Sequence, residues 1–510
     1  MRPSMYAIGV DSGTQGTKVL IVDFKGKVRG RGFAPHRSIE NLPPGSSEQD
    51  PWTWIGALEQ ALAQALKEAK INPQDIVSMG VGGQQHGFVP LGKEGTPLRP
   101  AKLWNDTSTL EETEIIIERL GGAKKFIEKL GTSLAVGYTA SKILWLKRHE
   151  PHNYRKLWSV LLPHNFLNYY LTGKCQMEYG DASGTGLMDI RKRAWHREAI
   201  ASIDQELEAK LPPLLHPSQP LGYMREEIVS HFEMRKVLVS SGGGDNMMGA
   251  IGTANVSPGV CTLSLGTSGT IYSYFPEPFC DPEGEIAAFC DSTGGWLPLL
   301  CTMNVTNTTE FFKAAFNLSN QELERRALKA RPGAEGLLFL PFLDGERVPV
   351  LPFASGVFFG LSRQNFNPSE MARAVMEGTI LNLGYGFSRM RSLGLKPAEI
   401  RATGGGAKSR LWLQIVADIF KTPVITLKEQ EAAAFGAALQ SIWNYFKEKG
   451  EDVKIEEIAK ESVKKDKLAA EPRPENFALY DAYQERFNSL WKTLKEEFHL
   501  HKKALEKTRG

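Results

Sequence analysis

Near the middle of the chain lies the segment Lys236-Val-Leu-Val-Ser-Ser-Gly-Gly-Gly-Asp-Asn-Met-Met-Gly-Ala-Ile-Gly252. Its apolar run, Val237 to Val239, predicts a buried strand, and Met247 to Ile251 predicts the beginning of a helix. The three glycines at residues 242–244 allow a sharp turn and a close approach of a ligand to the backbone. Asp245 is then expected at the mouth of the helix, where the positive end of the helix dipole favours an ionised carboxylate. Because a lone Asp after glycines is more often a turn or cap residue than a catalyst, this segment alone leaves both roles open.

Length and composition limit the class of protein. A chain of 510 residues is too long for one hydrophobic core, so two or more domains are expected. Its 61 basic and 58 acidic residues give a net charge of +3, which predicts no surface for nucleic acid or membranes. The five cysteines show no CxxC spacing, which argues against a disulfide framework or a structural zinc and favours a reducing compartment. Since Met1 to Tyr6 lack a signal-peptide core and no apolar run reaches the length of a membrane span, the expected location is the cytoplasm.

Two distant segments share a pattern of strand, Gly- and Thr-rich turn, and strand. The first joins strands at Tyr6–Val10 and Val19–Val22 through Asp11-Ser-Gly-Thr-Gln-Gly-Thr-Lys18, and a third strand after Lys25-Gly-Lys27 would complete an antiparallel meander. The second is Cys261-Thr-Leu-Ser-Leu-Gly-Thr-Ser-Gly-Thr-Ile-Tyr-Ser273. Each turn can cradle a phosphate through backbone N–H groups, or can be a plain hairpin. As a pair they predict two related domains that hold a nucleotide in the cleft between them.

Two loops in the first half carry further candidates. A strand at Val77–Val81 ends in Gly82-Gly-Gln-Gln-His-Gly87, so His86 lies at the carboxyl end of a strand, where ligands bind in α/β folds; a structural loop histidine is the alternative. Ser108-Thr-Leu-Glu111 predicts a capping box and hence a helix just after Asn105 and Asp106, which are ligand candidates or turn residues.

Later segments alternate between strands and helices. Asp50-Pro51 predicts a helix to about Ala69, and Asn367-Pro-Ser-Glu370 a long helix to about Leu393. A strand at Ile400–Thr403 leads through Gly404-Gly-Gly-Ala-Lys-Ser409 into a helix at Leu411–Phe420, an arrangement that suits a phosphate or an adenosine, or a tight turn.

The last part of the chain is mostly helical in its pattern. Helices are expected at residues 429–446 and 476–498, with a charged, solvated helix and linker over residues 447–467. The alternation along the whole chain gives an α/β fold class.

Taken in order, these segments resemble the FGGY carbohydrate kinases, a family within the actin-like ATPase (ribonuclease H-like) superfold, over about residues 6 to 490. The two hairpins, the segment from Gly137 to His149 and the segment from Gly356 to Glu377 carry the resemblance. It implies two domains: residues 1–252, with the sugar site, the first phosphate hairpin and the catalytic Asp at its end, and residues 253–510, with the second hairpin, the adenosine site and a C-terminal helix.

Within the family, the chain is similar to the branch that phosphorylates xylulose. The matching segments are Ser47–Trp52, Gly83–Gly87, Leu103–Asp106, Asp181–Thr185, Gly242–Asn246 and Gly345–Arg347. It departs from the common residues of that branch at Gln85, at Ser108 and at Val348-Pro-Val350.

The resemblance implies ATP-dependent, Mg²⁺-assisted phosphorylation of O5 of D-xylulose to give D-xylulose 5-phosphate. Asp245 would be the general base, and Asp11 and Asp245 would hold Mg²⁺. The implied sugar contacts are Gln85, His86, Asn105, Asp106, Asp245 and Asn246. The implied nucleotide contacts are Asp11, Thr14, Gln15, Lys18, Gly266, Thr267, Ser268, Gly405, Gly406, Ala407 and Arg410.

Two alternatives remain at this stage. A kinase of the same family could act on another substrate, such as ribulose, gluconate, fuculose or an erythritol-type polyol, because motifs do not fix the orientation of a single hydroxyl. A non-catalytic, actin-like nucleotide-switch protein would also explain both hairpins, but it would have no use for Asp245. The expected partners are a sugar and ATP, without nucleic acid or membrane, and a homodimer is possible.

Overall fold

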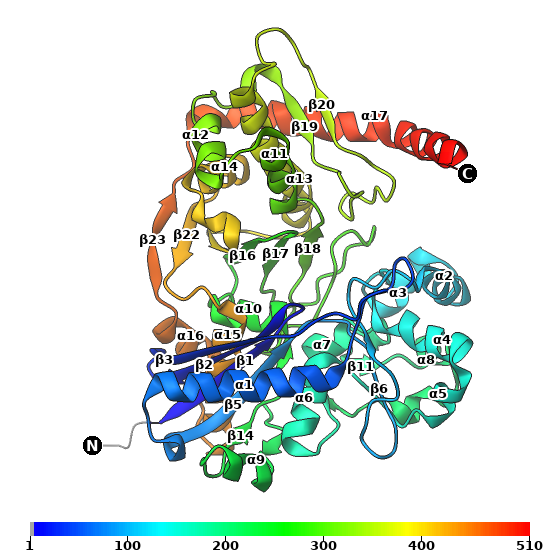
Figure 1. The fold of residues 1–510 in the computed structure, drawn as a ribbon, viewed down its shortest axis with the longest axis vertical. Coiled ribbons are helices and arrows are strands. Elements are labelled where there is room, and N and C mark those ends of the chain that lie inside the picture. Colours follow the sequence, from blue (N-terminus) through cyan, green and yellow to red (C-terminus); the bar gives the residue numbers. More distant parts are fainter. Residues whose placement is uncertain (1–4, 510) are drawn as a thin grey trace. The chain divides into compact units, whose positions relative to one another are not determined.

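The computed structural model describes residues 5–509, so residues 1–4 of the N-terminal segment and Gly510 lie outside the described part. The chain forms two compact units (Figure 1). Unit 1 runs to Ser257 and adds the segments Tyr274–Pro298 and Glu431–Lys464. Unit 2 comprises Pro258–Ser273, Leu299–Gln430 and the chain from Lys465 onward. Unit 1 is therefore built from three separate parts of the chain.

The sheet of unit 1 has the strand order β13-β14-β5-β1-β2-β3, with β15 beside β5. The first three strands form the predicted antiparallel meander, β5 runs parallel to β1, and β14 and β15 run parallel to β5. The bounds are β1 Tyr6–Ser12, β2 Gly16–Asp23, β3 Val28–Pro35, β5 Ile76–Gly83, β13 Gly222–Tyr223, β14 Leu238–Val239 and β15 Gly243–Gly244.

The sheet of unit 2 repeats this topology in the order β18-β17-β16-β21-β22-β23. Its first three strands are an antiparallel meander, followed by two parallel strands and an antiparallel edge strand. The bounds are β16 Val260–Leu265, β17 Gly269–Ser273, β18 Leu299–Thr302, β21 Glu399–Thr403, β22 Val424–Leu427 and β23 Lys465–Ala470. The internal repeat read from the two hairpins is therefore confirmed as a repeat of whole sheets, and the α/β class is confirmed.

Short strands pair outside the main sheets as β4 Glu48–Gln49 with β7 Ala101–Lys102, β6 Val89–Leu91 with β8 Ser159–Leu161, β9 Met177–Glu178 with β12 Leu214–Leu215, β10 Met188–Asp189 with β11 Ala194–Trp195, and β19 Leu338–Leu340 with β20 Val357–Phe359. The helices of unit 1 are α1 Pro51–Ala69, α2 Leu110–Arg119, α3 Ala123–Leu130, α4 Thr139–His149, α5 Pro151–Lys156, α6 Pro163–Thr172, α7 Tyr179–Ser183, α8 Arg197–Ala201, α9 Glu226–His231, α10 Asp245–Gly252, α15 Ala432–Glu448 and α16 Ile455–Ser462. Those of unit 2 are α11 Thr306–Phe316, α12 Asn320–Ala327, α13 Pro368–Ser392, α14 Arg410–Phe420 and α17 Phe477–Arg509. Within residues 5–509, no helix combines the length and the apolar character that a membrane span requires.

The caps of the long helices follow the sequence. Asp50 accepts a hydrogen bond from Trp52 N (3.1 Å) at the start of α1, and Asn367 accepts from Ser369 N (3.0 Å) at the start of α13. Each side chain satisfies a backbone donor that the first helical turn leaves without a partner, and a proline follows each cap. The predicted starts of these two helices are confirmed.

The backbone of the alanine-rich helix α15 packs directly against the backbones of α10 and of the sheet of unit 1. A Cβ atom on Gly436 would lie 1.8 Å from Met248 O, one on Gly252 would lie 1.9 Å from Ala432 O, and one on Gly9 would lie 1.9 Å from Ala434 O. Glycine is therefore required on both sides of this contact. The contact explains why the segment that contains α15 belongs to unit 1, although it lies far along the chain.

Three expectations about local structure need correction. The capping box at residues 108–111 is wrong, because α2 begins at Leu110 after Thr109 and has no side-chain cap bond; the Ser108 hydroxyl donates instead to Asp106 Oδ1 (2.5 Å). The charged stretch at residues 447–467 contains α16 but ends in strand β23, which pairs with β22. The central helix α10 begins at Asp245, two residues earlier than its apolar run.

Candidate active site

Asp245 is the first residue of α10, directly after a turn that packs on the end of β5. Gly243 and Gly244 pair with Gly82 and Gly83 in the parallel register of β15 and β5. A Cβ atom on Gly244 would lie 2.6 Å from the Gln85 Cγ. The absence of side chains on these glycines thus brings the backbone of the Asp245 turn against the loop that follows β5.

Asp245, Asn246 and Gln85 form a hydrogen-bonded cluster. The Asn246 side-chain amide donates to Gln85 Oε1 (2.9 Å) and to Asp245 Oδ1 (3.0 Å), and Asn246 N donates to the same Asp245 oxygen (2.8 Å). Burial, and next the charge of Asp11, raise the pKa of Asp245 to about 7, against the effect of the Asn246 bonds. The buried Gln85 Nε2 has no hydrogen-bond partner within residues 5–509. The cluster therefore combines a proton acceptor with an amide donor that remains available to a ligand.

The first hairpin supplies a second carboxylate. Asp11 and Lys18 lie directly opposite each other in β1 and β2. Lys18 Nζ in turn lies 2.5 Å from Glu431 Oε2, just before α15. Burial raises the pKa of Asp11 to about 6; Lys18 opposes this shift and Glu431 adds to it. Glu431 was not among the predicted site residues, and its partner is 413 positions away in the sequence.

The residues present fit Mg²⁺. The buried Oδ1 of Asp11 receives no hydrogen bond within the described part of the chain, and a hard cation prefers such carboxylate oxygens. In the described part, no three His, Cys, Asp or Glu side chains gather in a group that could hold a metal. This arrangement suits magnesium, which is usually bound through one or two carboxylates together with waters and substrate phosphates.

The backbone conformation of His86 is unusual, and its ring is fixed by contacts with Gly184 and Tyr138. Its backbone φ is +62°, in the left-handed region. Its Nδ1 lies 2.8 Å from Gly184 O, and its ring stacks on Tyr138 at 4.3 Å between centroids. Because a carbonyl oxygen only accepts, Nδ1 carries the proton, and Nε2 of the neutral ring is an acceptor. A Cβ atom on Gly184 would lie 2.5 Å from the ring, so only glycine fits there.

The loop with Asn105 and Asp106 divides into an exposed and a buried part. Asn105 is exposed, whereas Asp106 is fully buried. The Asp106 carboxylate accepts from Lys102 Nζ (3.0 Å), from Ser47 N (2.9 Å), and from the backbone N (3.1 Å) and hydroxyl of Ser108. With these bonds and no exposed surface, the Asp106 carboxylate holds the loop together.

The tip of the first hairpin is fixed by side chains of unit 1. Thr14 Oγ1 donates to Gln84 Oε1 (3.1 Å) and accepts from Trp104 Nε1 (3.0 Å), and Thr14 O accepts from Gln49 Nε2 (2.7 Å). Gln15 is exposed at the tip. The structure thus joins the first hairpin to the loop of Asn105 through Trp104.

In unit 2 the second hairpin lies beside the glycine turn after β21. A Cβ atom on Gly406 would lie 2.8 Å from the Leu265 Cβ, immediately before the turn Gly266–Ser268. Thr306 N and Val305 N donate to Gly266 O (3.0 Å) and Thr267 O (3.1 Å), so α11 begins at the same turn. The predicted nucleotide residues Gly266, Thr267, Ser268, Gly405, Gly406 and Ala407 therefore lie in one region, and the exposed Arg410 begins α14 next to it.

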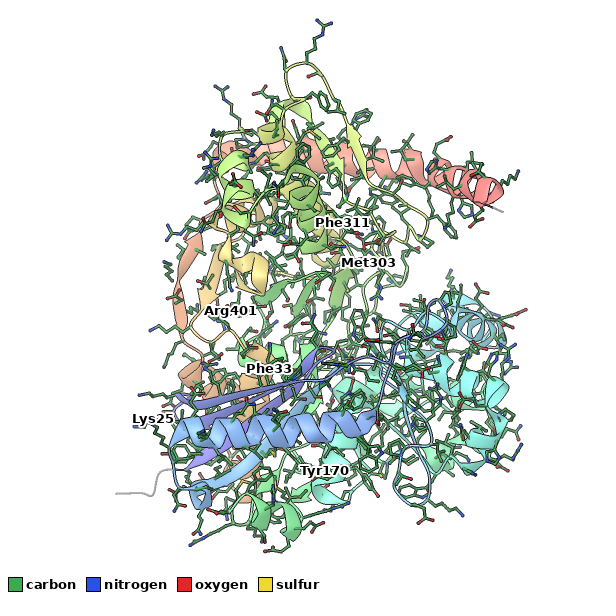
Figure 2. All side chains as sticks on the ribbon, viewed as in Figure 1. Lys25, Phe33, Tyr170, Met303, Phe311 and Arg401 are labelled. Atoms are coloured by element: carbon green, nitrogen blue, oxygen red, sulfur yellow. The ribbon has the colours of Figure 1, made fainter. Side chains whose placement is uncertain are left out.

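A hollow of about 480 Å³ opens beside Thr267 in unit 2. It is lined by Thr267, Thr306, Asn307, Glu310, Phe311 and Ala314. Figure 2 shows Phe311 and Met303 in this part of unit 2. Apart from Thr267, none of these lining residues was predicted, since nothing in the sequence of α11 marks it as a ligand-facing helix.

The chain is similar to known proteins in both sequence and fold. The family model described as the FGGY family of carbohydrate kinases matches with its N-terminal domain at residues 6–252 and with its C-terminal domain at residues 263–445. A xylulose kinase of Haemophilus influenzae is 46% identical over 86% of this chain and 90% of its own. A ligand-bound xylulose kinase and a gluconate kinase, both from Lactobacillus acidophilus, each superpose with a TM-score of 0.90 at 26% identity, over 98% of this chain and 100% of theirs.

Proposed function

Because the chain belongs to the FGGY family of carbohydrate kinases, we propose that it transfers the γ-phosphoryl group of ATP to O5 of D-xylulose, giving D-xylulose 5-phosphate. The single observation that carries the proposal is the cluster of Asp245, Asn246 and Gln85, with a carboxylate at the start of a helix and an amide donor beside it. The choice of xylulose is supported by the relative with 46% identity, a xylulose kinase that this chain matches over 90% of its length.

Asp245 acts as the general base. Its carboxylate accepts the proton of the attacking hydroxyl, and the Asn246 amide holds one carboxylate oxygen in place. Gln85 Nε2, His86 Nε2 and the exposed Asn105 orient the sugar hydroxyls. One base is sufficient, because positioning and charge neutralisation provide most of the acceleration in phosphoryl transfer.

Residues of both hairpins, of the glycine turn after β21 and of the start of α14 hold the nucleotide. In unit 1 these are Asp11, Thr14, Gln15 and Lys18, and in unit 2 they are Gly266, Thr267, Ser268, Gly405, Gly406, Ala407 and Arg410. Asp11 and Asp245 would hold Mg²⁺, which, when bound, neutralises charge on the phosphate oxygens. Lys18 exchanges its partner Glu431 for a phosphate oxygen, a step favoured by the partial exposure of both side chains.

The same proposal includes a role for each half of the chain, the location of the protein in the cell and its oligomeric state. Residues 1–252 provide the sugar site and residues 253–510 the adenosine site. The protein works in the cytoplasm, which is supported by its five cysteines, all free thiols in the structure. Its near-balanced charge favours small-molecule substrates over nucleic acid. It is a possible homodimer, and sedimentation of the purified chain measures that state.

The function is tested by release of ADP from MgATP with a panel of ketoses, polyols and aldonic acids. Selective turnover of D-xylulose is the expected result. Preference for gluconate or another substrate would overturn the choice of sugar and would point to Gln85, Ser108 and Val350 as altered specificity positions. ATP binding without turnover of any sugar would overturn the assignment as a kinase and favour a nucleotide switch.

The ionisation of Asp245 predicts a pH dependence. With both substrates far below saturation, the rate reports the ionisation of the free enzyme, in which the pKa of Asp245 is raised to about 7. Only the carboxylate can accept a proton, so the rate should fall about tenfold for each pH unit below 7 and level off above it. A rate that is flat between pH 5 and 8 would contradict the role of Asp245 as base.

A further inference from the structure

Lys142 is a fully buried lysine near the start of α4. Its Nζ donates to His86 O (2.7 Å) and to Gly137 O (2.6 Å). No carboxylate in the described part of the chain forms an ion pair with it. Burial lowers the pKa of Lys142 well below its usual range, while the charge of Asp106 acts in the opposite direction. Such a group is costly to bury, and an apolar side chain would fill the same space at a lower cost in free energy.

The two carbonyl groups that Lys142 binds belong to residues of unusual backbone conformation. His86 has φ +62° and Gly137 has φ +94°, both in the left-handed region. For His86, which has a Cβ atom, this conformation is strained and persists only where the surroundings enforce it. Lys142 joins the two turns through its Nζ, and it acts on the backbone of His86, whose ring is already fixed by Gly184 and Tyr138.

We propose that Lys142 is a positioning residue for sugar binding: its ammonium group holds the backbone of His86 in the left-handed conformation that directs the imidazole Nε2 toward the sugar. This inference rests on the proposed function, in which His86 contacts the sugar. It gives a role to Lys142, which lies in the segment Gly137–His149 and has no other role in the proposed mechanism.

Thr139 binds the same carbonyl oxygen, His86 O, and so allows an independent test of its role. Its hydroxyl donates to His86 O at 3.2 Å, a longer and neutral bond than that of Lys142. Because this bond is longer than the 2.7 Å bond of Lys142, loss of the Thr139 hydroxyl should act in the same direction with a smaller effect.

The test is a double-mutant cycle with Lys142→Met, His86→Ala and the double variant, measured as the KM and kcat of the sugar that the wild type phosphorylates and as the KM of MgATP. Loss of a hydrogen bond from a charged donor is expected to raise the sugar KM about tenfold to a hundredfold, with the KM of MgATP changed by less than about twofold. In the His86→Ala background, Lys142→Met should raise the sugar KM by less than about threefold, because its effect passes through His86.

Lys147→Met is the matched control, because Lys147 lies on the same helix but is half-exposed and pairs with Asp204 (2.7 Å). It should change neither KM. Thr139→Val replaces Lys142→Met if the latter does not fold, with a smaller rise in the sugar KM as the expected result. Equal rises in both KM values, or additive effects of Lys142→Met and His86→Ala, would overturn the proposal and leave Lys142 a purely structural residue.

A readout without turnover separates this inference from the proposed function. In protein labelled with ¹⁵N-histidine, the His86 signals are identified by their loss in His86→Ala. Lys142→Met should shift the Nδ1 signal of His86, since the ring leaves Gly184 O when the backbone relaxes. An unchanged His86 spectrum would overturn the positioning role even if the enzyme phosphorylates xylulose, whereas a shifted spectrum would support it even if no sugar in the panel were a substrate.

Discussion

Asp245→Asn is expected to lower kcat by about 10²–10⁴-fold, the usual contribution of a positioned base, while binding of ATP measured without Mg²⁺ stays within about twofold of the wild type. Asn has nearly the shape of Asp but cannot accept the hydroxyl proton. Burial raises the pKa of Asp245 to about 7, which brings the neutral form of this side chain close to neutral pH. Unchanged binding of the nucleotide will show that the variant is folded.

The measurement is single-turnover and steady-state phosphorylation, together with calorimetric binding of a non-hydrolysable ATP analogue. Asp204→Asn is the matched control, because Asp204 is a partly exposed carboxylate paired with Lys147 and lies outside the cluster of Asp245, Asn246 and Gln85. It should retain full turnover. If Asp245→Asn keeps more than about a tenth of the wild-type kcat, Asp245 is not the base.

Gly436→Ala is expected to destabilise unit 1 by about 3 kcal/mol, at the upper end of what overpacking usually costs. The added methyl group would lie 1.8 Å from Met248 O and 2.8 Å from the Met248 carbonyl carbon, and backbone atoms of a packed helix cannot move aside as a flexible side chain can. Helix α15 would be forced away from α10, whose first residue is Asp245. Thermal unfolding should therefore begin several degrees lower, and turnover should fall as well.

Gly56→Ala is the matched control, since Gly56 is also a helical glycine, but it is exposed on α1 and a Cβ atom there meets nothing within 4 Å. The same substitution should leave the protein unchanged or stabilise it by about 0.5–1 kcal/mol, because Ala is a better helix former than Gly. Equal melting temperatures for the two variants would show that the contact between α10 and α15 is looser than the structure has it.

The parts of the fold that the sequence predicted are those in which neighbours along the chain decide the structure. The short apolar runs at Tyr6–Val10 and Val19–Val22 predicted the meander, Asp50-Pro51 and Asn367-Pro368 predicted two helix starts, and the similar hairpins near residues 11 and 267 predicted the repeated sheets. The pattern at residues 108–111 failed because the buried carboxylate of Asp106 binds the Ser108 hydroxyl that would have capped the helix.

The features of the candidate site that were predicted are likewise those that depend on neighbouring residues in the sequence. The glycine turn placed Asp245 at a helix start, and the strand end placed His86 in a loop, both from patterns within a few residues. No pattern near Lys18 or Glu431 predicts that these two side chains pair, and none near Gly184 predicts that it leaves room for the His86 ring.

By itself, then, the sequence determined the α/β class, the family and the carboxylate at the start of α10, because caps, turns and hydrophobic periods act over a few residues. Only the tertiary structure decided that the Asp106 carboxylate is buried, that Lys142 donates a hydrogen bond to His86 O, and that α15 belongs with the first half of the chain. These contacts join residues far apart in the sequence, and they depend on close backbone packing that glycines permit and that no local pattern records.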